Sequence, residues 1–203
     1  MILGKTQIEH LIEDGYLAIE RRNHKGELNN KLSLNPASLD VHLHSITMVE
    51  QHPILSYIDC IKPIETQVVA NKIDPGNDNG IVLYPDYLYL ATIEEGLIKT
   101  PDFVIPDLSG KSSVGRLGIT VEVSAGWGDP GFQGYYTLEI IVKYPIKVYV
   151  GMPIAQIRFN AMQHISFPNL HSGEVYAGKY QNQKQEPTLC QFDKNYDPET
   201  GWM

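Results

Sequence analysis

Two stretches of the sequence carry side chains that could do chemistry. SGKSSVGRLG, residues Ser109–Gly118, combines three glycines, three hydroxyl side chains and two cations. Asp129 and Glu139 follow in and after a glycine-rich segment. Cations and backbone amides bind phosphate, and a partly buried carboxylate can act as a general base because burial raises its proton affinity. The pattern therefore points to phosphate binding and proton transfer as the chemistry to test.

The loop differs from the phosphate-binding loop of P-loop enzymes. That motif needs a glycine, four further residues and then Gly-Lys-Ser or Gly-Lys-Thr, between a strand and a helix. Here the first glycine is missing and no helical pattern follows. Backbone amides of Ser112, Ser113 and Gly115 could still form an anion-binding concavity. Lys111 and Arg116 would supply charge, and an ordinary tight turn is the other interpretation that the loop alone allows.

The segment around Glu139 is typical of a strand. In YYTLEIIV, one side is formed by Tyr136, Leu138, Ile140 and Val142, and the other by Tyr135, Thr137, Glu139 and Ile141. Glu139 allows two interpretations. It has a structural role, in an ion pair with Arg116 or in a solvent-facing position, or it acts as a general base. Asp129 belongs to Asp-Pro-Gly, which is a turn signature in its own right.

The elements that must position these residues are strands with one short helix. TQIEHLIEDG predicts a helix with Thr6 as N-cap, Glu9 in a capping box and Gly15 as the stop. Strand-like runs separated by turn residues follow, namely SLDVHL, GIVLYP, YLYLATI, ITVEV, YYTLEIIV, IKVYV and PIAQIRF. This pattern predicts an all-β barrel or sandwich with one helix at its edge.

Composition limits what this chain can be. Its 203 residues, 42% of them hydrophobic, predict a single domain over residues 1–203. The net charge of -8 argues against a protein that holds nucleic acid through its phosphates. Cys60 and Cys190 are too few for a disulfide framework, and no apolar run approaches the roughly 18 residues of a membrane span. We expect a cytoplasmic protein, in the host cytoplasm if it is viral, with no membrane partner.

Several motifs in order resemble one known family. GKSSVGRLG, SAGWGDPGFQG and TLEI, from residues 110–140, resemble the central motifs of the dCTP deaminases, which belong to the dUTPase-like superfamily. NPASLDVHL resembles the family's early Ser-x-Asp strand, YAGKYQNQ its nucleotide-clamping tail, and GKTQIEHLIEDGYLAI its N-terminal helix. The resemblance spans most of the chain and is weakest over residues 45–80.

The resemblance implies a fold and an assembly. The family has a mainly β, dUTPase-like distorted barrel of jelly-roll type with a short N-terminal helix, and its homotrimers form active sites between subunits. Residues 174–203 would be a tail that closes over nucleotide. The family deaminates without zinc, and the chain lacks the His-x-Glu and Pro-Cys-x-x-Cys signature of zinc deaminases. His42 and His44 alternate on a strand but have no third metal ligand nearby in the sequence.

The resemblance also implies roles for individual residues. Glu139 would activate water for attack on cytosine C4, Ser112 would position the water or the amine, and Arg116 would support the developing charge. The nucleotide-binding residues it implies are Lys111, Ser113, Ala125, Gly126, Trp127, Tyr176, Lys179, Tyr180 and Gln183. Magnesium is expected on the triphosphate, because two or three cations do not neutralise its charge.

A second hydrolysis is implied by the turn motif. Ser124–Trp127 resembles the members that also cleave the triphosphate to dUMP and pyrophosphate, with Asp129 activating the water that attacks the α-phosphate. Four alternatives stay open: a deaminase that releases dUTP, a deaminase of 5-substituted dCTP, a plain dUTPase and a non-catalytic nucleotide sensor. Many relatives have His at the position of Glu122. This difference motivates the alternative of a deaminase of 5-substituted dCTP, and it bears on feedback by dTTP. The expected partners are dCTP and dUTP.

Overall fold

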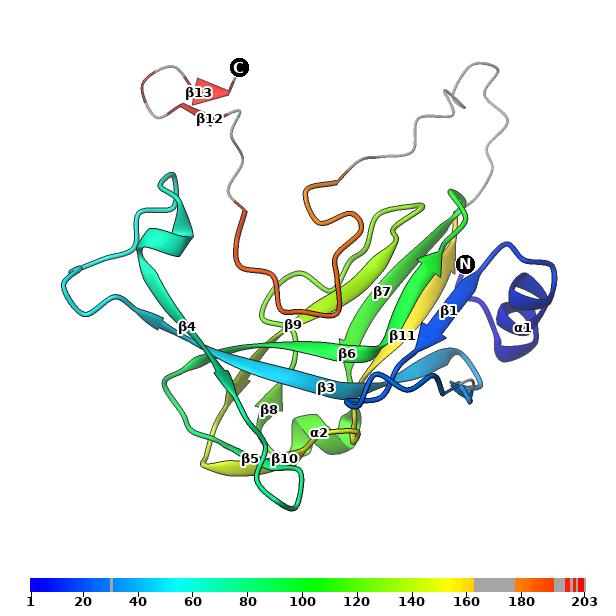
Figure 1. The fold of residues 1–203 in the computed structure, drawn as a ribbon. Coiled ribbons are helices and arrows are strands. Elements are labelled where there is room, and N and C mark those ends of the chain that lie inside the picture. Colours follow the sequence, from blue (N-terminus) through cyan, green and yellow to red (C-terminus); the bar gives the residue numbers. More distant parts are fainter. Residues whose placement is uncertain (30, 163–177, 192–195, 198, 200, 203) are drawn as a thin grey trace.

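Antiparallel strand pairing organises the chain (Figure 1). The structure is a computed structural model that describes residues 1–29, 31–162, 178–191, 196–197, 199 and 201–202. Its helical elements are α1 (Lys5–Glu13), the short 3-10 helix η1 (Ile64–Thr66) and α2 (Ser112–Arg116). In the described part of the chain, none of these has the length and apolar character needed to span a bilayer.

Strands are the main regular secondary structure of the described chain. In order they are β1 (Ala18–Arg21), β2 (Ser33–Asn35), β3 (Ser38–Gln51), β4 (Val68–Ile73), β5 (Gly80–Leu83), β6 (Leu88–Lys99), β7 (Val104–Gly110), β8 (Ile119–Thr120), β9 (Gly134–Val142), β10 (Ile146–Tyr149), β11 (Pro153–Ala161), β12 (Tyr196–Asp197) and β13 (Gly201–Trp202). β10 pairs with β5, and β12 pairs with β13. The alternating runs of the sequence predicted β3, β5, β6, β9, β10 and β11, although β3 extends well beyond SLDVHL.

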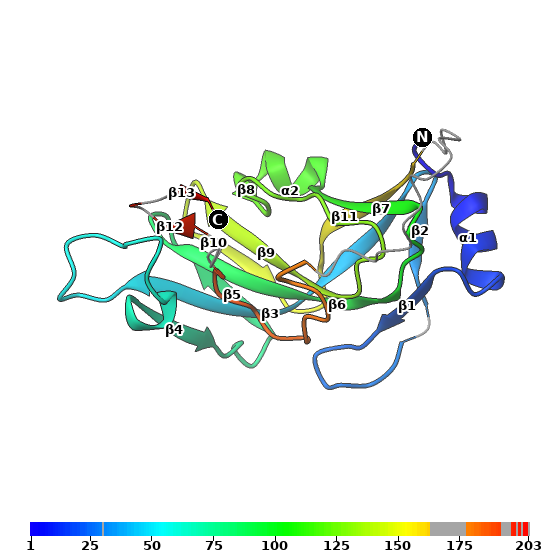
Figure 2. The same cartoon turned by 90° about the horizontal axis from the view of Figure 1, so that it is seen from above.

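Nine strands form one sheet in the order β7-β11-β3-β6-β9-β8, with β1 paired to β6 and both β2 and β4 paired to β3. The sheet curls into a nearly closed barrel, with α1 at one end and β4 at the other (Figure 1; Figure 2). This arrangement confirms the predicted mainly β, distorted barrel with an N-terminal helix.

The helix α1 begins earlier than the sequence predicted. The Gly4 N–H donates to Gln7 Oε1 at 2.8 Å, so the cap lies at Gly4 and the assignment of Thr6 as N-cap was wrong. The reason is tertiary, because Leu3 donates its N–H to Phe159 and Lys5 donates its N–H to Pro36, which holds the chain immediately before the helix against the sheet. Gly15 has a φ of 71° and ends the helix as predicted.

The predicted two sides of β9 are confirmed. Tyr136, Leu138, Ile140 and Val142 are all buried in the barrel core, whereas Glu139 on the opposite side is half-buried. Period-2 alternation therefore directs the apolar side chains inward and the carboxylate outward from the core. One short helix was missed: Ser112–Arg116, expected to be loop, forms the helical turn α2 between β7 and β8. Five residues are too few for a helical period to appear in a sequence.

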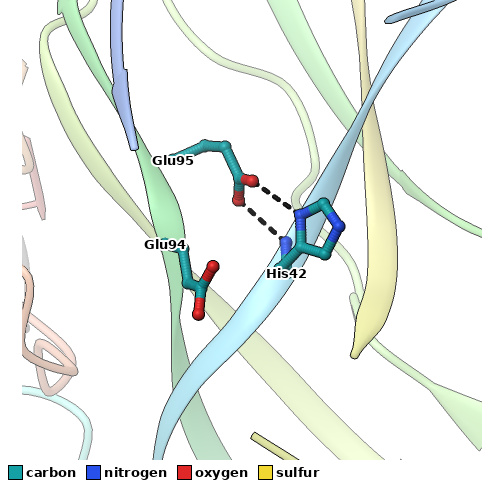
Figure 3. Close-up of side chains that lie close together, drawn as sticks. All are labelled: His42, Glu94 and Glu95. Atoms are coloured by element: carbon teal, nitrogen blue, oxygen red, sulfur yellow. Dashed lines mark hydrogen bonds and ion pairs between the residues drawn. The ribbon is translucent and has the colours of Figure 1, made fainter. Parts of the chain in front are cut away.

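A buried ionic cluster holds β1, β3 and β6 together, and Figure 3 shows its members from β3 and β6. β6 bulges between Thr92 and Gly96, where its pairing with β9 shifts, and the bulge contains Glu94 and Glu95, which are 2% and 1% exposed. Arg21 contacts Glu94 at 2.9 Å and Glu95 at 3.1 Å. His42 Nδ1 lies 2.6 Å from Glu95 Oε1, and its backbone N–H donates to Glu95 Oε2 at 2.8 Å. The two buried carboxylates thus have charged and hydrogen-bonding partners.

This cluster changes the interpretation of the histidines. The sequence offers no third metal ligand near His42 and His44, yet the fold brings both glutamates of the bulge to His42, with all three ligand atoms within 4.8 Å of one another. The guanidinium of Arg21 already bonds both carboxylates, so its positive charge takes the place that a metal ion would need. His44 instead lies 3.3 Å from the hydroxyl of Thr92.

Removing one charge from the cluster should destabilise the fold. We expect Glu95→Gln to lower the free energy of unfolding by about 3 kcal/mol, because breaking a buried ion pair leaves its partner uncompensated. Urea denaturation measures the change. Glu9→Gln is the matched control, since Glu9 forms an exposed pair with Lys5 at 3.8 Å that should contribute less than about 1 kcal/mol. Equal losses in the two variants would contradict the structural role of the cluster.

Candidate active site

A cavity of about 590 Å³ opens on the side of the sheet that carries Glu139. β9, β6 and the ends of β3 and β4 form its floor. Its walls come from the loop 123–132 and from the segment 178–191, which lies over β9 and β6 (Figure 1; Figure 2). The lining residues come from four parts of the chain, residues 49–68, 88–90, 123–139 and 180–190, which meet around Glu139.

Glu139 lies at the boundary between polar and apolar parts of the cavity. Its Oε2 accepts a hydrogen bond from the backbone N–H of Val123 at 3.2 Å, which orients the carboxylate. Leu90 is its direct cross-strand partner on β6, and both residues line the cavity. A half-buried carboxylate with one oxygen held and apolar neighbours has the environment expected of a general base.

The loop 123–132 packs along the edge of β7 and brings in a second carboxylate. Leu108 donates its N–H to the Gly126 carbonyl at 2.7 Å, and Gly128 donates its N–H to the Pro106 carbonyl at 2.8 Å. Asp129 and Trp127, both on this loop, line the cavity with Glu139. The loop therefore behaves as an added strand that places two predicted site residues beside a third.

Close packing explains the glycines of this loop. A Cβ on Gly126 would lie 2.1 Å from the Leu108 carbonyl oxygen, and one on Gly128 would lie 2.1 Å from the Tyr136 hydroxyl. That hydroxyl donates to the Pro106 carbonyl at 3.1 Å. Burial, the largest cause, and the nearby Asp107 and Asp129 raise the pKa of Tyr136 far above its ordinary value. Tyr136 therefore remains a neutral hydrogen-bond donor under the loop.

The C-terminal segment 178–191 closes another side. Tyr180 and Gln183 line the cavity as nucleotide-binding candidates, and the Gln183 carbonyl accepts the N–H of Tyr135 at 3.0 Å. Gly134 has a φ of 128°, and a Cβ there would lie 2.6 Å from the Gln183 nitrogen, so the close approach requires glycine. Lys179 is in the same segment, and Tyr176 lies outside the described residues.

The predicted phosphate loop lies elsewhere on the protomer. Lys111, Ser112, Ser113 and Arg116 are not among the described residues that line the cavity. Lys111 instead forms a 2.5 Å ion pair with Asp40. The structure thus brings together Glu139, Asp129, Ala125, Trp127, Tyr180 and Gln183, places Gly126 behind the loop against Leu108 and Glu122, and leaves the Lys111–Arg116 segment apart.

Sequence reasoning missed two groups of residues. Gln156 supports the phosphate loop, donating to the Gly110 carbonyl at 3.1 Å and accepting from the Ser38 hydroxyl at 3.1 Å. The second group is an apolar wall of the cavity, formed by Val49, Ile58, Ile64, Val68, Leu88 and Leu90. Most of this wall comes from residues 45–80 or just after, where the family resemblance is weakest. The alternation in YLYLATI was the one sequence pattern that could have indicated the residues of this wall that lie on β6, Leu88 and Leu90.

Comparisons with known proteins identify the family of this chain. A family model described as dCTP deaminase-like matches residues 2–162. The chain belongs to this dCTP deaminase-like family.

Relatives named "dCTP deaminase, dUMP-forming" cover most of the chain. The protein of that name from Clostridium acetobutylicum is 39% identical over 166 residues, which is 81% of this chain and 86% of the relative. The Methanosphaera stadtmanae relative is 32% identical over 198 residues, 97% of this chain and 96% of its own. This family member is therefore similar to its relatives along nearly their whole length.

A solved structure supports the fold. The 2'-deoxycytidine 5'-triphosphate deaminase from Agrobacterium tumefaciens matches with a TM-score of 0.55 and 24% identity. The match covers 79% of this chain and 47% of that chain, so the described fold spans about half of that protein. The likeness concerns the fold of the barrel.

The packing of the 123–132 loop can be tested by substitution. Gly128→Ala should lower the free energy of unfolding by about 1–3 kcal/mol, because the new methyl group overlaps the Tyr136 hydroxyl and the Pro106 carbonyl. Gly115→Ala is the matched control. A Cβ there meets no atom within 4 Å, and alanine in a helix should be neutral or stabilise by up to about 1 kcal/mol. Denaturation of both variants provides the measurement, and a Gly128→Ala protein as stable as wild type would refute the packing.

Proposed function

We propose that this protein hydrolyses the amine of dCTP at cytosine C4 and then cleaves the resulting triphosphate to dUMP and pyrophosphate. The observation that carries the proposal is that Glu139 and Asp129, one carboxylate for each hydrolysis, line a single cavity. The names of the relatives at 32–40% identity support the same reaction. They favour dUMP over dUTP as the final product, and they favour catalysis over a plain dUTPase or a silent nucleotide sensor.

In the first hydrolysis, Glu139 acts as the base. It removes a proton from water, whose oxygen attacks C4 to give a tetrahedral centre. The carboxyl then passes that proton to the exocyclic nitrogen, the C–N bond breaks and ammonia leaves. The remaining proton of the C4 hydroxyl moves to N3, which gives the C4 carbonyl and the N3–H of uracil. The backbone N–H of Val123 holds Oε2 of the carboxylate, which fixes the direction of proton transfer. The organic product of this step is dUTP.

The second hydrolysis uses the other carboxylate. Asp129 accepts a proton from a water molecule that attacks the α-phosphorus, and the bond to the bridging oxygen of the β-phosphate breaks. dUMP and pyrophosphate leave. The position of Asp129 on the loop 123–132, held against β7 by the Gly128 hydrogen bond, supports this role because the loop cannot swing freely.

Assembly would complete the site. Ser112 and Arg116, proposed to position water and support charge, lie outside the cavity of their own protomer. We propose that a neighbouring subunit of a homotrimer supplies them, together with Lys111 and Ser113 for the phosphates. In the protomer Asp40 holds the Lys111 ammonium and Gln156 bonds the Gly110 carbonyl, which would present this loop in a fixed form to the neighbour.

Magnesium would enter with the nucleotide. The described residues offer one cluster of three metal-ligating side chains, the His42 cluster, and Arg21 fills it. The cavity contains the carboxylates of Asp129 and Glu139, and we propose that the ion is held by the phosphate oxygens, where it would neutralise their charge. The tail residues Lys179, Tyr180 and Gln183 would hold the bound nucleotide.

We further propose feedback by dTTP at this site and a cytoplasmic location.

Replacing the proposed base should separate the two hydrolyses. With Mg²⁺ present, Glu139→Gln should lower kcat for dCTP deamination by about 10²–10⁴, the usual contribution of a general base. Cleavage of added dUTP should remain measurable. Chromatography of dCTP, dUTP and dUMP follows both reactions, with exposed Glu13→Gln as a control that keeps wild-type rates. Undiminished deamination by Glu139→Gln would remove Glu139 from the mechanism.

Replacing the second carboxylate should have the opposite effect. We expect Asp129→Asn to convert dCTP to dUTP, which then accumulates, because the attacking water at the α-phosphorus loses its base. Time courses of dUTP and pyrophosphate measure this, and Asp102→Asn on the surface is the control. Unchanged pyrophosphate release by Asp129→Asn would argue that the triphosphate is cut without Asp129.

A further inference from the structure

The C-terminal segment contacts the sheet through glutamines at every second position. Gln181, Gln183 and Gln185 are half-buried, whereas the intervening Asn182 and Lys184 are exposed. Gln181 accepts the Gln133 N–H at 3.0 Å and donates to the Gly131 carbonyl at 3.1 Å. Gln185 donates to the carbonyls of Arg22 at 3.1 Å and Ile93 at 3.3 Å. The segment 181–188 is therefore docked along β9, β6 and β1 of its own subunit.

The hydroxyl of Thr137 joins two points of this segment. It donates to Gln183 Oε1 at 2.9 Å and accepts the backbone N–H of Thr188 at 3.2 Å. A hydroxyl has one proton to donate, and here that proton and an acceptor lone pair are both used by the same segment. Gln183, Thr188 and Thr137 all line the cavity, so this junction lies at its rim.

Thr137 is also the neighbour of the proposed base. It precedes Glu139 by two residues on β9, and alternation along the strand puts both on the same face. Its cross-strand partner Thr92 is fully buried, with its hydroxyl 2.9 Å from the Ser45 hydroxyl. Thr137 thus stands next to a buried part of the sheet and holds the C-terminal segment through two hydrogen bonds.

We propose that the Thr137 hydroxyl is the latch that keeps the segment 181–188 closed over the cavity, which makes Thr137 a positioning residue for nucleotide binding. Its kinetic consequence rests on the proposed function. If the latch is lost, the closed form becomes a smaller fraction of the protein, and the apparent affinity for nucleotide falls by that fraction. The base itself is untouched, so turnover of bound substrate should change little.

Isosteric removal of the hydroxyl tests the latch. Thr137→Val should raise the KM for dCTP by about 5–30-fold, corresponding to one or two lost hydrogen bonds, with kcat near that of wild type. Thr137→Ser restores the hydroxyl and should restore the KM. A loss confined to kcat, or a serine variant that behaves like the valine variant, would overturn the proposal.

A second measurement needs no substrate. Trypsin cleavage after the exposed Lys184 should be faster in nucleotide-free Thr137→Val than in wild type or Thr137→Ser, because opening of the segment exposes its backbone. Thr120→Val removes an exposed hydroxyl from β8, and this variant should be cleaved at the wild-type rate. Equal cleavage of Thr137→Val and wild type would refute the latch. If the wild-type protein does not turn over dCTP, the proposed function fails while this measurement still decides the latch.

Discussion

The antiparallel pairing of β9 with β6 is the interaction on which the described site depends. Its register puts Leu90 beside Glu139 and Thr92 beside Thr137. The proposed base therefore lies next to an apolar wall, and the proposed latch lies next to a buried hydroxyl. A shift by one residue would turn Glu139 into the core and expose its apolar neighbours. Burial of Leu138 and Ile140 on the opposite face makes such a shift costly, so core packing maintains the position of the carboxylate.

Two kinds of carboxylate in this protein differ in their burial and in their partners. Glu94 and Glu95 are fully buried and both bonded by Arg21, which ties β1 to the bulge of β6. Glu95 also contacts His42 of β3 (Figure 3). Glu139 is only half-buried, and from the described residues its carboxylate accepts one hydrogen bond, donated by Val123. Further acceptor positions of the carboxylate can therefore bind water or a ligand. Removing one partner of a buried ion pair destabilises a fold, whereas a carboxylate that stays accessible at an apolar surface can do chemistry.

The bulge also connects the ionic cluster to the cavity. Ile93 belongs to the bulge, and its carbonyl accepts a hydrogen bond from Gln185. The carbonyl of Arg22, next to Arg21, accepts a second hydrogen bond from Gln185. The pairs that fix β1 on β6 therefore also create the docking points of the C-terminal segment. The backbone next to the ionic cluster therefore also binds the C-terminal segment. These hydrogen bonds explain how a segment without regular secondary structure is held on the sheet.

The sequence by itself determined the fold class, the family resemblance and the side of β9 that bears Glu139, because period-2 alternation and short ordered motifs are local properties of a chain. Tertiary structure decided the start of α1, since hydrogen bonds to Pro36 and Phe159 hold the residues before it. It also decided that Glu94 and Glu95 meet His42, and that the apolar wall from residues 49–68 faces Glu139. Contacts between distant segments leave no spacing pattern in a single sequence. The same reason separates Asp129, which the fold brings to the cavity, from Ser112 and Arg116, which it leaves on another part of the protomer.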